Sequence, residues 1–172
     1  DWSIRKFISL AKQQPWFENT IFAFVADHGA LMETKFDVPL SYNHVPFIIY
    51  APNLITENRS IKNYGGQIDV FPTLMNLIDL PYTNNTLGIN LLTENRPYTY
   101  FCHDEKLGVI NDEFLYIYRG KSEPSLYKYN DDDLTDYIKD YPAIADSMKI
   151  YAFSNMQAAQ FLIAKSQTAI KP

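Results

Sequence analysis

Two residue types that bind metals stand side by side in Asp27-His28-Gly29, directly after an apolar run at residues 21–26. A carboxylate oxygen and an imidazole nitrogen on adjacent residues can both reach one divalent cation if the backbone turns sharply, and glycine at the next position permits that turn. The pair is therefore half of a candidate metal site. A further candidate, His44, stands just before a second apolar run at residues 46–50.

Two short strands must position these side chains. Residues 21–26 and 46–50 are continuous apolar runs, which are too short for helices and typical of strands buried on both faces. An amphipathic helix is expected at residues 2–14, where Pro15 ends the pattern. A helix that leads into a buried strand indicates an α/β sheet, which presents side chains to a ligand crevice at the carboxyl ends of its strands.

The arrangement of the two strands decides whether the candidate residues meet. Parallel neighbours in the sheet would bring His44 to the same edge as Asp27 and His28. The polar stretch between the strands, residues 29–45, has no clear periodicity, and we interpret it as a long functional loop. The third histidine, His103, has no motif around it and is interpreted as solvated or structural.

A second helix start follows these motifs. Asp69 at an N-cap position and Pro72 in the first turn predict a helix at residues 69–80. We interpret Asp69 as a helix cap. The next segment, residues 81–97, is rich in Asn, Thr and Pro and is expected to be a surface connection.

The remainder of the chain predicts a small sheet and then helix. An antiparallel meander is expected from three short β-like runs, at residues 98–103, 113–118 and 125–129. The acidic triplet Asp131-Asp132-Asp133 is expected to cap and charge a helical segment. That segment extends to about Ser166 and is broken near Pro142.

Composition narrows the classes of function. The 172 residues are 47% hydrophobic and 20% charged, which is ordinary for one globular domain with a real core. The net charge of -5 gives no broad basic field that could attract nucleic acid or an anionic membrane surface, so an anionic substrate would need a local cation. The apolar runs are far shorter than the ~20 residues of a membrane-spanning helix.

The order of these motifs resembles the C-terminal half of sulfatase-type proteins of the alkaline phosphatase superfamily, and most of all the lipoteichoic acid synthase and phosphoglycerol transferase branch. The resemblance covers about residues 1–140 and rests on Asn19-Thr20, Asp27-His28-Gly29, residues 44–52 and residues 67–74. It implies an α/β fold, as part of an alkaline-phosphatase-like sandwich with a mainly parallel sheet, a small antiparallel meander and C-terminal helices. Residues 1–130 would be the C-terminal portion of the catalytic domain, and residues 131–172 a helical segment packed on it.

The resemblance also implies roles for residues. Asp27 and His28 would bind the catalytic divalent metal, for which Mn, Zn, Mg and Ca are not distinguished. The nucleophile of the family, which is Thr, Ser or a formylglycine, lies upstream of these ligands and is not found in this chain. Thr20 is no substitute, because an extended strand places it ~23 Å from Asp27 at about 3.3 Å per residue. Cys102, the only cysteine, lacks the residues that mark a formylglycine site.

His44 distinguishes the branches of the family. By the resemblance, His44 would bind a second metal, contact the phosphate of the substrate or protonate the leaving group. It is therefore a candidate both as a metal ligand and as a catalytic residue. True sulfatases commonly have Arg at this position, whereas relatives that transfer phosphoryl groups often have His, which favours phosphorus over sulfur. Lys35 in the loop could still imitate the anion contact of sulfatases.

The implied function is a metal-dependent phosphoryl or phosphoglycerol transferase or phosphoester hydrolase, with a sulfatase or a non-catalytic scaffold domain as alternatives. Its substrate would be an anionic ester, such as a lipid or glycan headgroup, and nucleic acid is not expected as a partner. The remainder of its own catalytic domain would be needed, so the chain alone is expected to be inactive. The resemblance further implies a membrane-anchored parent protein with an extracytoplasmic catalytic domain, of which this chain is a soluble portion.

Overall fold

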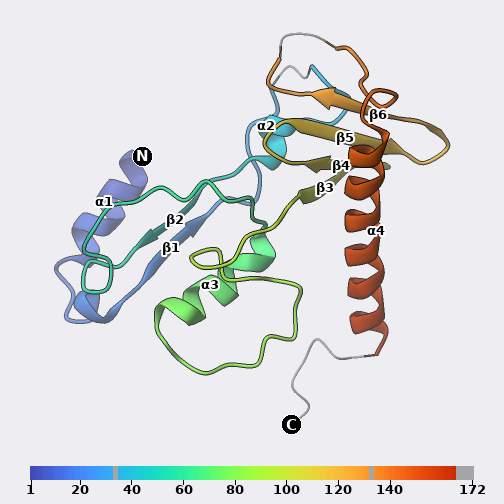
Figure 1. The fold of residues 1–172 in the computed structure, drawn as a ribbon. Coiled ribbons are helices and arrows are strands. Elements are labelled where there is room, and N and C mark those ends of the chain that lie inside the picture. Colours follow the sequence, from blue (N-terminus) through green and yellow to red (C-terminus); the bar gives the residue numbers. More distant parts are fainter. Residues whose placement is uncertain (33–34, 132–133, 166–172) are drawn as a thin grey trace. The chain divides into compact units, whose positions relative to one another are not determined.

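The computed structural model describes residues 1–32, 35–131 and 134–165 (Figure 1). Clustering of contacts divides the chain into two compact units, and each takes two stretches of sequence. Unit 1 holds residues 1–27 and 45–60, and unit 2 holds residues 28–44 and the chain from Ile61 onward. The chain thus leaves unit 1 after Asp27 and returns to it after His44. The boundary at residue 130, expected from the sequence, stays a prediction.

Unit 1 packs a helix and a 3-10 turn on one face of a two-stranded sheet. Its elements are α1 (Trp2–Ala11), η1 (Phe17–Asn19), β1 (Phe22–Val25) and β2 (Phe47–Tyr50). Ala11, Phe17 and Phe22 form the buried core, and ring contacts between Phe17, Phe22 and Tyr50 have centroid distances of 5.4 to 6.3 Å. The predicted helix and both predicted strands are confirmed.

The two strands of unit 1 pair antiparallel, so the expectation of parallel neighbours is wrong for this pair. Val25 pairs with Phe47 and Phe22 with Tyr50, which places the end of β1 beside the start of β2. In a parallel pair these two strand ends would lie at opposite edges, so only the antiparallel pairing brings the residues after β1 and before β2 to one edge. All strand pairs among residues 1–32, 35–131 and 134–165 are antiparallel, and the mixed α/β class is confirmed.

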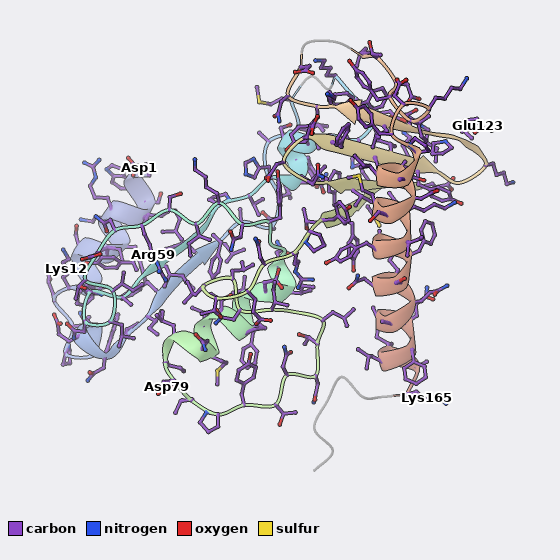
Figure 2. The ribbon with its side chains drawn as sticks, in the orientation of Figure 1. Asp1, Lys12, Arg59, Asp79, Glu123 and Lys165 are labelled. Carbon is purple, nitrogen blue, oxygen red and sulfur yellow. The ribbon has the colours of Figure 1, made fainter. Side chains whose placement is uncertain are left out.

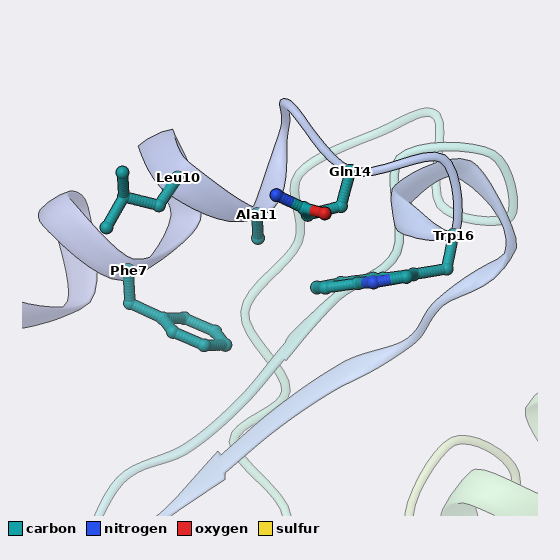
Figure 3. A pocket seen from close by; sticks show the side chains of 5 residues that line it. All are labelled: Phe7, Leu10, Ala11, Gln14 and Trp16. Carbon is teal, nitrogen blue, oxygen red and sulfur yellow. The ribbon is translucent and has the colours of Figure 1, made fainter.

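Part of the apolar surface of unit 1 is uncovered, which corrects the expectation that both faces of the strands are buried. Val25 is 39% exposed and Ile48 is 49% exposed. A shallow apolar groove lies between α1 and the turn that follows it (Figure 3), and is lined by Phe7, Leu10, Ala11, Gln14 and Trp16. Apolar strands predict burial, but they do not say which chain segment covers them.

Unit 2 is built on a four-stranded antiparallel meander. Its strands follow one another in sequence order as β3 (Thr99–His103), β4 (Lys106–Ile110), β5 (Phe114–Arg119) and β6 (Ser122–Lys128). The meander was predicted, but with three strands, because β4 has Gly108 at its centre. Gly108 pairs with Phe101, and a Cβ at Gly108 would lie 2.6 Å from the Phe101 ring. A larger residue at position 108 would therefore require the Phe101 ring to move.

Helix α4 (Pro142–Ala164) covers one face of the meander, and its last turns extend past the sheet toward Lys165 (Figures 1 and 2). The core between helix and sheet contains Ala145, Met148 and Ala152 against Leu107, Val109, Tyr116 and Leu126. Pro142 begins the helix instead of breaking it, because proline fits the first helical turn and not the interior. Residues 134–141 are not helical, which corrects the prediction. Asp132, Asp133 and Ser166 lie outside the described residues.

The opposite side of the sheet packs against the loop that follows His28. Phe36 and Val38 are buried with Leu115 and Ile117 of β5 in a second core cluster. A short helix, α2 (Leu40–Asn43), completes the loop. The stretch interpreted as a long functional loop therefore has its own anchors in the core of unit 2.

An ion pair holds the same loop from its polar side. The guanidinium of Arg119 donates to both carboxylate oxygens of Asp37, at 2.7 Å from Nε and 3.0 Å from Nη2. Hydrogen bonding to Arg119 outweighs partial burial and lowers the pKa of the Asp37 carboxyl below its ordinary value. A bidentate pair of this kind is among the stronger surface ion pairs.

Asp37→Asn is expected to lower the free energy of unfolding by about 1 kcal/mol at pH 7. Because the folded pKa of Asp37 is lower than its unfolded value of about 3.9, this contribution is complete above that value and disappears as the pH falls through the folded pKa. Urea unfolding of both proteins at neutral and at acidic pH measures the difference. Asp140→Asn, at an exposed position, serves as the control, and an Asp37→Asn penalty that persists in strong acid would contradict the assignment.

Candidate metal centre

The backbone at Gly29 lies against the turn formed by residues 41–44, within unit 2. The Gly29 amide donates to the Tyr42 carbonyl at 2.8 Å. A Cβ at Gly29 would lie 2.1 Å from the Ser41 carbonyl oxygen and 3.2 Å from that of His44, so no side chain fits there. Gly29 is not among the residues with positive φ. The glycine is thus required by a close backbone approach, not by the sharp turn expected from the sequence.

The imidazole of His28 is held in one orientation by two contacts. Its Nδ1 lies 2.9 Å from the Gly29 carbonyl oxygen, and its ring stacks on Tyr42 with centroids 4.5 Å apart and planes at 13°. A carbonyl oxygen only accepts hydrogen bonds, so Nδ1 carries the proton and the lone pair of the neutral ring is on Nε2. Histidine ligands in metal sites characteristically donate their other ring nitrogen to a carbonyl or carboxylate. The geometry of His28 therefore fits a divalent metal bound through Nε2.

Asp27 is exposed and lies two residues beyond the last residue of β1. It is the last residue of the first stretch of unit 1, and His28 begins the first stretch of unit 2. An anionic oxygen and a neutral imidazole nitrogen form a donor set suited to Zn²⁺ or Mn²⁺. This pair is chemically adequate as part of a metal site.

His44 directly follows α2, and its backbone amide donates to the Leu40 carbonyl at 2.9 Å. The residue is exposed. Its carbonyl lies beside Gly29, so the structure brings the backbone of His44 close to the His28-Gly29 dipeptide. In the part of the chain that the structure describes, no three His, Cys, Asp or Glu side chains gather closely enough to hold a metal ion. The role of His44 as a ligand stays a prediction.

Two residues near His28 were not identified from the sequence. Tyr42 stacks on His28, and the His103 ring contacts the Tyr42 ring edge to face, with centroids 6.0 Å apart and planes inclined by 62°. His103 ends β3, and its Nε2 lies 3.7 Å from the Asp104 carboxylate. The sequence signal for Tyr42 was its position two residues before His44, but His103 is 75 residues from His28 and carried no local signal.

The remaining candidate residues have partners of other kinds. Lys35 donates to the backbone carbonyl of Asp131, and the Thr20 hydroxyl donates to the Trp16 carbonyl at 2.8 Å. Cys102 is exposed and forms no disulfide. None of the helices within the described ranges is long and apolar enough to cross a membrane.

The stretch of chain that carries these motifs also matches known proteins. The sulfatase family model matches residues 1–80. A lipoteichoic acid synthase-like protein of Bacillus subtilis, YvgJ, is 26% identical over 132 residues, which are 67% of this chain and 21% of that protein. The structure of an alkaline phosphatase superfamily protein from Vibrio parahaemolyticus superposes with a TM-score of 0.73 and 20% identity, covering 99% of this chain and 41% of that one. The chain has the sulfatase-type fold of the alkaline phosphatase superfamily.

The chain also resembles arylsulfatase K of Canis lupus familiaris, at 28% identity over 97 residues that cover 54% of the chain and 18% of that protein. It therefore spans about a fifth of the length of these curated relatives. The superfamily is enzymatic and acts on phosphate or sulfate esters, typically with a divalent metal. The family model and the curated relatives support the expected resemblance to sulfatase-type proteins, and the superposed structure confirms the α/β fold class.

Proposed function

We propose that the protein containing this sulfatase-type chain is a metal-dependent phosphoryl or phosphoglycerol transferase or a phosphoester hydrolase, and that Asp27 and His28 bind its metal. The observation that carries the proposal is the Nδ1 hydrogen bond of His28 to the Gly29 carbonyl, on the residue that directly follows Asp27. With the proton on Nδ1, the lone pair that would bind a metal is on Nε2, in the residue next to a carboxylate.

The chain's own residues have distinct tasks in this proposal. A divalent cation supplies charge neutralisation at the ester oxygens and lowers the pKa of a nucleophile. Asp27 supplies an anionic oxygen and His28 a neutral nitrogen whose direction is fixed by the Gly29 carbonyl. His44 binds a second cation or the phosphate of the substrate, or protonates the leaving group. With a net charge of -5, the chain has no broad basic surface to hold an anionic ester by itself.

Two observations favour a phosphate ester over a sulfate ester as the substrate. His44 stands where the resemblance puts Arg in true sulfatases. The lipoteichoic acid synthase-like relative also matches more of the chain than arylsulfatase K does, 132 residues against 97. A sulfate ester hydrolase is the second candidate, because arylsulfatase K matches 97 residues and the matching family model is that of sulfatases.

We further propose that the chain works together with the remainder of its own catalytic domain, which supplies the nucleophile. The exposed apolar side chains of unit 1, including Leu10, Trp16 and Ile48, support such packing. The proposed substrate is an anionic ester on a lipid or glycan headgroup. The similarity to a lipoteichoic acid synthase-like protein supports a membrane-anchored parent with an extracytoplasmic catalytic domain.

The proposed substrate class is tested by assaying the whole protein with Mn²⁺ on an aryl phosphodiester and on an aryl sulfate. We expect kcat/KM to be higher for the phosphodiester by tenfold or more, a discrimination of about the size that pocket contacts provide. His44→Arg is expected to reduce this preference. Faster turnover of the sulfate would establish the sulfatase alternative, and turnover of neither ester would favour a scaffold. The 172-residue chain alone is expected to be inactive on both esters.

A further inference from the structure

We infer that Tyr42 is a positioning residue for His28, and that His103 on the meander supports Tyr42 in this task. The inference rests on the proposed function, because it concerns the metal ligand named there. It assigns a purpose to two side chains that the sequence motifs do not include. All the contacts that carry it lie within unit 2.

Tyr42 holds the His28-Gly29 dipeptide in two independent ways. Its carbonyl accepts the Gly29 amide at 2.8 Å, which fixes the backbone beside the imidazole. Its ring lies nearly parallel to the imidazole, with centroids 4.5 Å apart. The Gly29 carbonyl in turn accepts the Nδ1 hydrogen of His28 at 2.9 Å. Tyr42 therefore restrains both the direction of the imidazole and the carbonyl that selects its tautomer.

Tyr42 is itself held by an anchored segment. It lies in α2, which follows Phe36 and Val38, and these two side chains are buried in the core against β5. Within α2, the Asn43 side chain donates to the Pro39 carbonyl at 2.9 Å. The Tyr42 ring is partly buried and cannot easily move away from His28 without moving this segment.

His103 contacts the Tyr42 ring from the end of β3. The register of β3 and β4 pairs His103 with Lys106, so Asp104 and Glu105 form a two-residue hairpin turn. Asp104 has a φ of 51°, in the left-handed region that non-glycine residues seldom occupy. This conformation accompanies a carboxylate 3.7 Å from His103 Nε2.

A chain of contacts connects the β3–β4 hairpin to the proposed metal ligand His28. Asp104 lies beside His103, the His103 ring meets the Tyr42 ring, and the Tyr42 ring stacks on His28. Partners of this type orient a ligand and set its basicity, and their loss commonly weakens metal binding by about 10- to 100-fold. Tyr42 contacts no substrate atom in this account and acts only through His28.

Calorimetric titration of the whole metal-free protein with Mn²⁺ tests the inference. Tyr42→Leu removes the aromatic stack and is expected to weaken Mn²⁺ binding about tenfold. Tyr42→Phe keeps the ring and is expected to stay within about twofold of the wild type, because the backbone carbonyl and the stack are retained. Tyr98→Leu is the matched control, since Tyr98 is a partly buried tyrosine of unit 2 that contacts Tyr151 instead of the site. It is expected to lower stability without changing Mn²⁺ affinity.

The outcomes separate this inference from the proposed function. If Asp27→Ala abolishes Mn²⁺ binding while Tyr42→Leu binds as tightly as the wild type, the proposed function stands and the positioning role is overturned. If the wild type does not bind Mn²⁺, or if Asp27→Ala and His28→Ala bind it unchanged, the proposed function fails and the inference fails with it.

A measurement on the unmodified protein covers the case in which Tyr42→Leu does not fold. In the metal-free protein with labelled histidine, the ring protons of His28 are expected to resonate upfield, because Tyr42 stacks on them at 4.5 Å. His28→Gln assigns the signals. Ring-proton shifts of His28 at ordinary solvent-exposed positions would overturn the inference.

Discussion

Replacing Asp27 by alanine in the whole protein is expected to lower kcat/KM on an aryl phosphodiester by at least about a hundredfold, the loss that follows removal of one charge-stabilising group from an active site. His28→Ala is expected to have an effect of the same size, and the double variant should lose little more, because both residues serve the same metal ion. Steady-state kinetics with Mn²⁺ in excess measures these losses.

The matched control for this prediction is Asp79→Asn. Asp79 is an exposed aspartate with a φ of 52°, a conformation that asparagine tolerates, and it lies at the end of the helix α3 (Val70–Leu77), outside the proposed site. Its variant is expected to retain wild-type kinetics. Asp27→Ala or His28→Ala with unchanged kcat/KM would show that the Asp27-His28 pair does not take part in the reaction.

The second large effect concerns stability. Breaking the buried ion pair of Asp69 and Arg96 is expected to lower the free energy of unfolding by about 3 to 5 kcal/mol, because removal of one partner leaves the other charge buried and uncompensated. The Asp69 side chain is fully buried and that of Arg96 is 9% exposed. Chemical denaturation of Arg96→Met and Asp69→Leu measures the two losses.

The pair organises the connection at residues 81–97. The Asp69 carboxylate accepts from the Gly66 amide at 2.8 Å, from the Ile89 amide at 2.7 Å and from Arg96. Arg96 also donates to the Leu87 carbonyl at 2.7 Å. Asp69 is the N-cap residue of α3, as predicted, but its carboxylate makes no capping hydrogen bond to that helix. It caps the preceding 3-10 turn, η2 (Gln67–Asp69), through the Gly66 amide.

A double variant distinguishes the ion pair from simple packing loss. Asp69→Leu with Arg96→Met removes both charges together, so it is expected to be less destabilised than the sum of the single variants. Arg59→Met, at an exposed position, is the control for loss of an arginine and is expected to change stability by less than about 0.5 kcal/mol. Additive losses in the double variant would contradict a coupled buried pair.

Much of the fold was predictable because its signals are local. The amphipathic pattern of α1, the apolar runs of β1 and β2, and the helix start before α3 all depend on residues within a few positions of one another. The direction of strand pairing was not predictable, because it depends on how the chain returns after some twenty residues. The apolar pattern of a single strand does not show whether its neighbour in the sheet runs parallel or antiparallel to it.

Other errors came from contacts between distant residues. Residues 134–141 have helical composition, but the Leu126 amide donates to the Asp136 carboxylate at 3.0 Å and the Tyr137 amide to the Leu126 carbonyl at 2.7 Å. These bonds hold the segment beside β6 in place of a helix. β4 was missed because Gly108 weakens the strand pattern, although Phe101 on the neighbouring strand fills the space.

The candidate site was predictable only where its residues are adjacent in the sequence. Asp27-His28-Gly29 is visible as a motif, and the sequence already indicated that Gly29 matters. Its physical reason, close approach to the Ser41 carbonyl, needed the structure. The contacts of Tyr42 with His28 and His103 were not predicted, because ring contacts between residues far apart in the sequence leave no motif.

The most direct test of the central claim is anomalous diffraction at the manganese edge from crystals of the whole protein loaded with Mn²⁺. We predict an anomalous peak within direct bonding distance of both an Asp27 carboxylate oxygen and the Nε2 atom of His28. A bound ion that contacts neither residue would contradict the account, as would a His28 bound through Nδ1.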